Sequence, residues 1–198
     1  IKFKVSPAVL IPGQETEELV NWVVKENTIG SPKLIDVCSG SGCIGIAIKK
    51  MIPASTVFGI DISTAAVELS KENSETLQLK VDFLEADILT KEIPFTDVDI
   101  IVSNPPYVKS SEAALMNANV LDYEPHLALF VSDQDPLLFY KRLAEIGKKS
   151  LKIGGKLYLE INENLSKETA EILELQGFHD ISIRKDLNDR FRMIRAIR

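Results

Sequence analysis

The sequence predicts an α/β protein with a mostly parallel sheet of seven strands, helices on both faces and an antiparallel hairpin at the end. Short apolar segments alternate with helical patterns along most of the chain, which is typical of a parallel sheet. Glycine-rich or polar residues directly follow several of these apolar segments. Two alternating segments separated by a short polar stretch close the chain and predict the hairpin.

Length and composition limit the classes of protein to which the chain can belong. The 198 residues, 45% of them hydrophobic, predict one domain over residues 1–198. A net charge of −6 argues against strong binding to nucleic acid. No apolar run reaches the roughly 20 residues that span a bilayer, and no signal peptide is visible, so we expect a cytoplasmic protein without membrane contact. We also expect a monomer. Because the chain begins with Ile1, we also expect a missing N-terminal part.

The first half of the chain is predicted to follow an extended lead-in with one helix and then strand–helix units. Apolar residues at helical spacing, with glutamates in the first turn, predict a helix over Gln14–Glu26. Ser63 can cap another helix that follows the second strand. The apolar segments expected to be strands are Lys33–Val37, Thr56–Asp61, Leu79–Leu84 and the stretch from Asp97 to Asn104.

The second half contains one long irregular region before the regular pattern resumes. Residues 108–132 show no periodicity, and loops of this length in a compact domain are usually functional. A turn is expected at residues 153–155 because of its paired glycines. The remaining predicted elements are a helix over Asp135–Lys149, a strand over Lys156–Ile161, a helix over Ser166–Leu175 and a hairpin of Phe178–Arg184 with Phe191–Ile197.

The fourth strand runs into the tetrapeptide Asn104-Pro105-Pro106-Tyr107. Proline has no N–H for a sheet and restricts the residue before it, so the strand must end in a rigid corner. The Asn104 side-chain oxygen and the Pro105 carbonyl could each accept one hydrogen of an –NH2 group, while Tyr107 offers a flat apolar face for stacking. We therefore predict catalytic roles for Asn104, Pro105 and Tyr107, and substrate binding by Asn104, Pro105, Pro106 and Tyr107.

Further polar residues follow the other strands, at the edge where parallel sheets bind ligands. Asp61 could accept hydrogen bonds from the vicinal hydroxyls of an adenosine ribose, Asp87 could reach the adenine amino group, and Ile88 could lie against the ring. Taken singly, Asp61 has an ordinary explanation as a helix-start residue and Asp87 as a turn residue. The residues predicted to bind the cofactor are Cys38, Ser39, Gly40, Ser41, Gly42, Asp61, Asp87, Ile88 and Asn104.

An adenosine site suits either a nicotinamide dinucleotide or S-adenosylmethionine. The spacing Gly40-x-Gly42-x-x-Gly45 fits a dinucleotide fingerprint, but hydride transfer has no evident use for the Asn104 corner. A methyltransferase that acts on a planar amide or aromatic amine does use it, which favours S-adenosylmethionine. No Gly-Lys-Ser/Thr follows the glycines, so a Walker loop is disfavoured. Cys38 and Cys43 lack the second ligand pair expected of a zinc site, so no metal is predicted.

Residues 104–107 resemble the motif of amino methyltransferases, which include DNA adenine, RNA guanine and protein glutamine enzymes. The flanking segments resemble one branch, the HemK/PrmC family of release factor glutamine N5-methyltransferases. The segments that carry this likeness are Val9–Pro12, Glu15–Val20, Asp36–Ile44, Tyr123–Leu129 and the group Asp186, Leu187 and Arg190. The resemblance implies a Rossmann-like class I fold, S-adenosyl-L-methionine as methyl donor with S-adenosyl-L-homocysteine as product, and peptide-chain release factors as the protein substrate.

The chain departs from the family's pattern at several positions. Gly13-Gln14 stands where the family usually has Arg-Pro, Cys38-Ser39 where it has Gly-Thr, and Ile88 where an aromatic residue is common. The family also has an N-terminal helical domain that helps to dock the release factor, which we expect to be absent here. Two alternatives therefore stay open: an amino methyltransferase for adenine or guanine of DNA or rRNA, and a weakly active S-adenosylmethionine-binding module.

Overall fold

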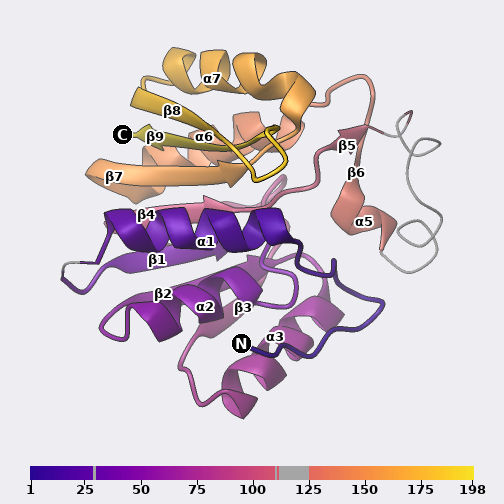
Figure 1. Cartoon of the computed structure of the whole chain (residues 1–198), viewed down its shortest axis with the longest axis vertical. Coiled ribbons are helices and arrows are strands. Elements are labelled where there is room, and N and C mark those ends of the chain that lie inside the picture. Colours follow the sequence, from indigo (N-terminus) through magenta and orange to yellow (C-terminus); the bar gives the residue numbers. More distant parts are fainter. Residues whose placement is uncertain (29, 110, 112–124) are drawn as a thin grey trace.

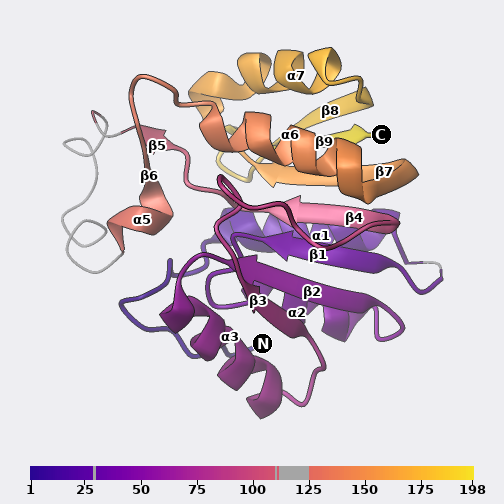
Figure 2. The same ribbon diagram turned by 180° about the vertical axis from the view of Figure 1, so that it is seen from behind.

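The computed structural model describes residues 1–28, 30–109, 111 and 125–198, and its centre is a twisted sheet (Figures 1 and 2). The strand order is β3-β2-β1-β4-β7-β9-β8. The five strands from β3 to β7 run parallel, whereas β9 is antiparallel to both β7 and β8. The predicted seven-stranded, mostly parallel sheet with a C-terminal antiparallel hairpin is therefore confirmed.

The described elements have the following bounds. The strands of the large sheet are β1 (Lys33–Val37), β2 (Thr56–Asp61), β3 (Asp82–Glu85), β4 (Val98–Ser103), β7 (Leu151–Glu160), β8 (His179–Lys185) and β9 (Phe191–Ile197). A separate parallel pair consists of β5 (Val108–Lys109) and β6 (Phe130–Val131). The helices are α1 (Gln14–Glu26), α2 (Cys43–Met51), α3 (Thr64–Thr76), α5 (His126–Leu129), α6 (Leu138–Ser150), the 3-10 helix η2 (Glu163–Leu165) and α7 (Ser166–Leu175).

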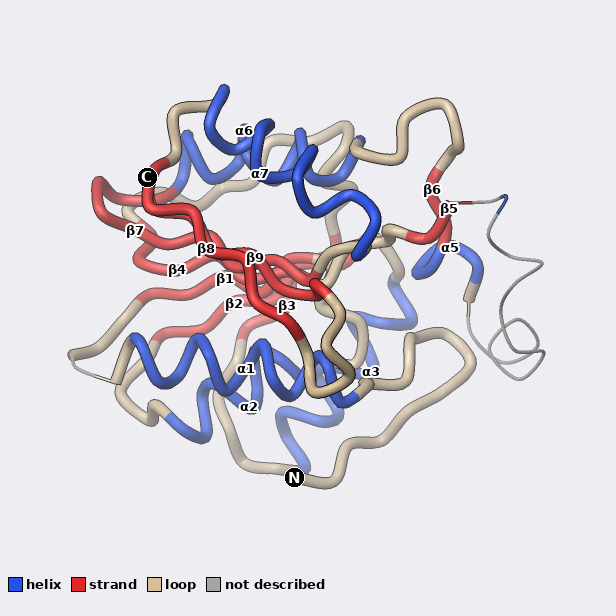
Figure 3. Tube along the Cα trace, turned by 45° about the horizontal axis from the view of Figure 1, so that its top comes forward, coloured by secondary structure: helices blue, strands red, loops and turns tan. Residues whose placement is uncertain are grey.

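Helices cover both faces of the sheet, as Figure 3 shows. On one face the sheet packs with residues of α1, α2 and α3, and on the other with residues of α6 and α7. Neighbouring residues of β1 illustrate this, because Leu34 lies in the first of these cores and Ile35 in the second. Burial on both sides explains why the parallel strands read as continuous apolar runs in the sequence.

The sequence predicted that the third strand begins at Leu79, but β3 begins three residues later, at Asp82. Residues 79–81 contact Ser74 of α3 instead of β2: the Leu79 N–H donates to the Ser74 carbonyl, and the Val81 N–H donates to the Ser74 hydroxyl at 3.3 Å. Pairing with β2 starts only at Asp82, which lies opposite Phe58. The carbonyl and the hydroxyl of Ser74, near the end of α3, thus accept from backbone N–H groups that a strand would have used.

The turn predicted at residues 153–155 is instead a bulge inside β7. Val98 of β4 pairs with Leu151, whereas Ile100 pairs with Lys156, so extra residues of β7 are accommodated between two paired positions. Gly154 adopts a left-handed φ of +80° and its N–H donates to the Arg198 carbonyl at 2.9 Å. The expected strand over Lys156–Ile161 is therefore only the second part of a longer strand.

The long loop predicted over residues 108–132 is described only at its two ends. These ends form β5, α5 and β6, while residues 110 and 112–124 lie outside the described part of the chain. Helix α6 begins at Leu138 and not at Asp135. None of the described helices is both long and apolar enough to cross a membrane.

Strand order decides where a ligand can bind. Strand β1 lies between β2 and β4, so the chain leaves β1 toward one side of the sheet and later returns on the other. A crevice forms outside the carboxyl ends of the strands at such a switch point. The segments that follow β1, β2, β3 and β4 meet there, as the sequence predicted.

Candidate active site

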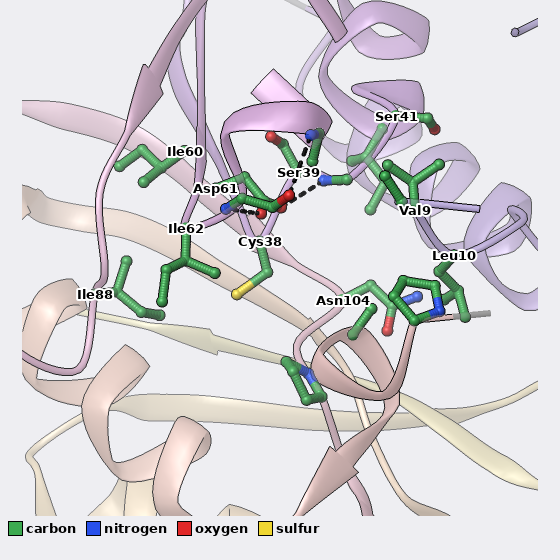
Figure 4. Close-up of a pocket in the computed structure, with 18 of the residues that line it drawn as sticks. Val9, Leu10, Cys38, Ser39, Ser41, Ile60, Asp61, Ile62, Ile88 and Asn104 are labelled. Atoms are coloured by element: carbon green, nitrogen blue, oxygen red, sulfur yellow. Dashed lines mark hydrogen bonds between the residues drawn. The ribbon is translucent and has the colours of Figure 1, made fainter. Parts of the chain in front are cut away.

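A cavity of about 310 Å³ lies at the carboxyl ends of β1, β2 and β4. Figure 4 shows Asn104 on one side of it, Cys38 in the middle, and Ile62 and Ile88 on the far side. Most of its lining is apolar, and polar groups come from the turn after β1, from Asp61 and from Asn104. An apolar cavity with a few converging polar groups is the usual form of a cofactor site.

The turn after β1 is held in a tight shape by left-handed backbone angles. The φ angles of Cys38, Gly40 and Gly42 are +60°, +54° and +77°. A Cβ on Gly42 would lie 2.8 Å from the Phe83 ring, so the turn packs closely against β3 at this point. The Ser39 N–H donates to the Ile60 carbonyl at 2.9 Å, which ties the turn to β2. Glycine at position 42 is therefore required by both φ and packing.

The same turn presents groups that suit a polar ligand. The hydroxyls of Ser39 and Ser41 are buried without a hydrogen-bond partner, although both residues line the cavity. A Cβ on Gly40 would meet no atom within 4 Å, so the backbone there leaves open space. Buried polar groups normally have a partner, and these two hydroxyls can bond a ligand. The turn therefore fits the polar part of S-adenosylmethionine.

Asp36 in β1 supports this turn from below, a role that the sequence analysis did not predict. Its Oδ2 accepts a hydrogen bond of 2.9 Å from the N–H of Gly45 near the start of α2, and its Oδ1 has no partner. Burial raises the pKa of the Asp36 carboxyl to about 7, against the lowering effect of the Gly45 bond. The available sequence signals were an acidic residue inside an apolar strand and the place of Asp36 at the start of the segment Asp36–Ile44 that carries the resemblance.

Asp61 connects the ends of β1 and β2. Its Oδ2 accepts from the Gly40 N–H at 2.8 Å, and its Oδ1 accepts from the Ser63 N–H at 2.9 Å. Burial raises the pKa of the Asp61 carboxyl above its ordinary value, while the bonds from Ser63 and Gly40 oppose the shift. Each carboxylate oxygen keeps lone-pair capacity for a further donor, as a ribose diol would require.

The third strand end adds an acid and an apolar side chain to the cavity. Both Asp87 and Ile88 line it, and Ile88 is buried. The Asp87 carboxylate already accepts from the Leu89 N–H at 2.9 Å and from the Thr90 hydroxyl at 2.8 Å. Asp87 is thus a turn residue in this structure, and any contact with a ligand would use its remaining acceptor capacity.

The predicted substrate tetrapeptide is divided between the cavity and the protein interior. Asn104 and Pro106 line the cavity, whereas Pro105 and Tyr107 are absent from its lining. The Tyr107 hydroxyl donates to Glu160 Oε1 at 3.0 Å, and burial raises its pKa well above the ordinary value. The structure therefore brings Asn104 together with the predicted cofactor residues and directs the Tyr107 hydroxyl inward.

Sequence reasoning missed the N-terminal segment as a wall of the cavity. Val9, Leu10 and Pro12 line it, and Val9 is buried against α3. Asn73 of α3 holds this segment, because its side chain bonds both the N–H and the carbonyl of Lys4, at 2.8 Å and 3.0 Å. The run Val9–Pro12 had been noted as part of the resemblance, which was the available signal.

Thr16 and Glu160 are further residues that the sequence analysis did not assign to the site. Thr16 lies in the first turn of α1 and also lines the cavity, whereas Glu160 is the last residue of β7. The Thr16 hydroxyl donates to Glu160 Oε2 at 2.9 Å. No local pattern links two residues so far apart in the chain, so only the fold reveals this contact.

Both cysteines are uncharged thiols. Burial raises the pKa of the Cys43 thiol to about 12 and that of Cys38 further still, so both remain neutral thiols. Within the described ranges, no group of three or more His, Cys, Asp or Glu side chains is placed to hold a metal ion.

Comparison with solved structures identifies the class of fold. The chain is similar to the hMettl16 catalytic domain, with a TM-score of 0.77 and 15% identity over 100% of this chain and 75% of that one. It is also similar to a methyltransferase from Pyrococcus furiosus, with a TM-score of 0.72 and 15% identity over 98% of this chain and 87% of that one. The fold is that of the Rossmann-like methyltransferases.

Sequence comparison then identifies the family. Residues 14–123 match the model of the methyltransferase small domain. Release factor glutamine methyltransferases from Flavobacterium psychrophilum and Bacteroides thetaiotaomicron are 44% and 45% identical to this chain, over 99% of it and 70% of each relative. The chain belongs to the release factor glutamine methyltransferase family. Membership implies use of S-adenosylmethionine, and neither alternative function is favoured by these relatives.

Proposed function

We propose that this chain transfers a methyl group from S-adenosylmethionine to the side-chain amide nitrogen of a glutamine in peptide-chain release factors. One observation carries the proposal: Asn104 lies in the same cavity as the turn after β1 and Asp61. A group that can hold an amide therefore faces groups that suit the methyl donor. The family to which the chain belongs supports the choice of substrate.

Residues of the turn and of the strand ends hold the cofactor in this proposal. The unpaired hydroxyls of Ser39 and Ser41 bond its polar groups, Asp61 accepts from the ribose hydroxyls, and Ile88 packs against the adenine. Cys38, Gly40, Gly42, Asp87 and Asn104 complete the proposed contacts. When bound, S-adenosylmethionine supplies a methyl group on a sulfonium that leaves as S-adenosylhomocysteine.

Asn104 and Pro105 orient the substrate amide. The Asn104 Oδ1 and the Pro105 carbonyl each accept one N–H of the glutamine –NH2 group, which directs the nitrogen lone pair toward the cavity. Pro106 and the Tyr107 ring form the adjoining surface for the glutamine side chain. The nitrogen gains the methyl carbon and loses one proton to solvent, so charge balances. Positioning of this kind can lower a barrier by up to about 7–11 kcal/mol.

The first prediction concerns Asn104→Ala. Loss of the amide removes the acceptor that orients the substrate nitrogen, so we expect kcat to fall by about 100- to 1000-fold, as happens when a key transition-state contact is removed. Transfer of labelled methyl to a release factor with a Gly-Gly-Gln sequence measures this. Calorimetry with S-adenosylmethionine checks that the cofactor still binds.

The matched control is a release factor in which that glutamine is replaced by alanine. Bulk DNA and rRNA are tested in parallel, because the same corner could hold the amino group of a flipped base. Labelled methyl on nucleic acid but not on release factor would overturn the proposal. Failure to bind S-adenosylmethionine would overturn it as well.

The proposal extends to the partner and the place of action. A release factor is the protein partner, and the net charge of −6 disfavours a strong nucleic-acid contact. We propose that residues 1–198 form one methyltransferase domain that acts as a cytoplasmic monomer. Light scattering after gel filtration tests the monomer, since a stable dimer would double the measured mass.

A further inference from the structure

Three polar side chains are linked to one another and to Asn104 by hydrogen bonds. Thr16 of α1, which is 5% exposed, and Glu160 of β7, which is 4% exposed, are buried, and Tyr107 is partly buried. Asn104 Nδ2 donates to the Thr16 hydroxyl at 3.3 Å, and that hydroxyl donates to Glu160 Oε2 at 2.9 Å. The Tyr107 hydroxyl donates to Glu160 Oε1 at 3.0 Å. Both oxygens of Glu160 are thus connected to the tetrapeptide.

The charge on Glu160 decides which group donates in each of the hydrogen bonds that connect Asn104, Thr16, Glu160 and Tyr107. An ionised carboxylate can only accept, so both neighbouring hydroxyls must point their hydrogens at it. Thr16 then has no hydrogen left and can only accept from Asn104. The Asn104 amide must therefore turn its –NH2 toward Thr16, which leaves Oδ1 free for the cavity.

A neutral Glu160 removes this constraint. Its own O–H can donate to Thr16, whose hydroxyl hydrogen is then free to donate to Asn104 Oδ1. The amide would turn over and present its –NH2 group to the cavity. Two –NH2 groups facing each other cannot hydrogen-bond, so Asn104 could not hold a substrate amide in this state.

We propose that Glu160 is a positioning residue that fixes the polarity of the Asn104 amide through Thr16 and holds the Tyr107 hydroxyl. Glu160 is not among the residues that line the cavity, so it acts through these neighbours. The inference rests on the proposed function, because it explains how Asn104 comes to offer an acceptor to a substrate –NH2 group.

The surroundings of Glu160 place its ionisation near neutral pH. Burial raises its pKa to about 7, and the charge of Glu15 adds to the rise, whereas the bonds from Thr16 and Tyr107 and the charge of Arg192 lower it. Arg192 itself lies within 4 Å of Glu163 and Asp186. The charge on Glu160 in turn raises the pKa of two other neighbours, Tyr140 and Cys43.

The sign of the pH effect follows from this raised pKa. The productive orientation requires the ionised form, which predominates above pH 7. With a pKa of about 7, the ionised fraction rises roughly tenfold between pH 6 and pH 8, and kcat should follow it. The rise should then level off at higher pH.

The first test compares Thr16→Val with Thr16→Ser. Valine has a similar shape but no hydroxyl, so it interrupts the connection between Glu160 and Asn104, whereas serine keeps it. We expect kcat for release factor methylation to fall about 10- to 100-fold in Thr16→Val, with little change in the KM for S-adenosylmethionine, and serine to restore most of the loss. Equal kcat values for the two variants would overturn the inference.

Thr169→Val is the matched control for burial. Thr169 is fully buried in α7 and its hydroxyl donates to the Leu165 carbonyl at 2.7 Å, away from the site. The control loses the same atoms and a similar hydrogen bond. If Thr169→Val lowered kcat as much as Thr16→Val, the effect would come from stability alone and the inference would fail.

The second test is the pH profile of Glu160→Gln. Glutamine can offer an N–H to Thr16, so we expect a lower kcat that no longer rises between pH 6 and pH 8. The control is Glu26→Gln, since Glu26 also accepts from a tyrosine, Tyr158, at 2.8 Å, but at the other end of α1. A pH rise that persists in Glu160→Gln would overturn the inference.

A readout without any substrate separates this inference from the proposed function. NMR titration of the labelled Glu160 carboxyl carbon should give a pKa near 7, and Thr16→Val should raise it further by removing a donor. If the wild-type protein does not methylate release factors, the proposed function fails while the titration still tests the network. If it methylates them but Thr16→Val leaves both the titration and kcat unchanged, only the inference fails.

Discussion

Asp36 of β1 and Glu160 of β7 are buried carboxylates at this edge of the sheet, and they differ in their hydrogen-bond partners. Burial raises the pKa of each to about 7. Asp36 accepts from the N–H of Gly45, whose direction is fixed by α2, whereas Glu160 accepts from two hydroxyls that can rotate. Protonation of Asp36 cannot reorient the Gly45 N–H. Protonation of Glu160 can reorient the Thr16 hydroxyl and, through it, the Asn104 amide.

The difference extends to the two halves of the site. On the cofactor side, close packing and backbone hydrogen bonds hold the turn after β1 in one shape. On the substrate side, the orientation of Asn104 depends on side-chain hydroxyls and on one ionisable group. We therefore expect the cofactor side to be sensitive to steric changes and the substrate side to be sensitive to pH.

The largest expected effect on stability is that of Gly42→Ala. The new Cβ would lie 2.8 Å from the Phe83 ring and 3.0 Å from the Ser70 Cβ, at a φ of +77°. Overpacking and backbone strain together should lower the free energy of unfolding by about 2–4 kcal/mol. Gly40→Ala is the control, because its φ of +54° is similar but its Cβ meets open space. Urea denaturation measures both variants, and equal losses would show that packing against Phe83 is unimportant.

An intermediate effect is expected on the pH dependence of stability. A carboxyl whose pKa is raised on folding binds more protons in the folded state, so stability falls as pH rises from the ordinary pKa, near 4, to about 7. Asp36→Asn and Glu160→Gln should each reduce this fall by about 1–3 kcal/mol. Urea denaturation at pH 5 and pH 8 measures the change.

Enzyme assays then distinguish the two carboxylates. Asp36→Asn should keep the rise of kcat between pH 6 and pH 8, whereas Glu160→Gln should lose it. If both variants lost the rise, Asp36 would also control the chemistry, and the contrast between fixed and rotating donors would be wrong.

The smallest expected effect is that of Cys38→Gly. Cys38 has a φ of +60°, a left-handed conformation that costs a side chain about 1–2 kcal/mol and suits glycine. Glycine loses more backbone entropy on folding, so we expect a net gain of about 0.5–1 kcal/mol over Cys38→Ala, which removes the thiol but keeps the Cβ. Thermal unfolding compares the stability of the two variants. A glycine variant less stable than the alanine variant would contradict the expectation that the left-handed backbone at position 38 is strained.

Local patterns in the sequence predicted much of the fold. Helices α1 and α7 have the predicted bounds, since their apolar spacing and end signals involve only neighbouring residues. The same holds for β1, β2 and the Ser63 cap, whose hydroxyl accepts from the Ala66 N–H. The predicted bounds of β3 and β7 were wrong. Hydrogen bonds from Leu79 and Val81 to Ser74 of α3 delay the start of β3, and the bulge in β7 is held by the bond between the Gly154 N–H and the Arg198 carbonyl.

For the site, the sequence by itself determined that Asn104 ends a strand in a rigid corner and that glycines follow β1, because proline and glycine act through their own backbone. Only the tertiary structure decided which side chains hydrogen-bond to the Asn104 amide and to its partner Thr16. Thr16 and Glu160 are 144 positions apart, and they meet because β7 lies beside β4 while α1 packs across both. A hydroxyl or carboxylate carries no local sign of its distant partner, so the strand order had to be known before its role could be inferred.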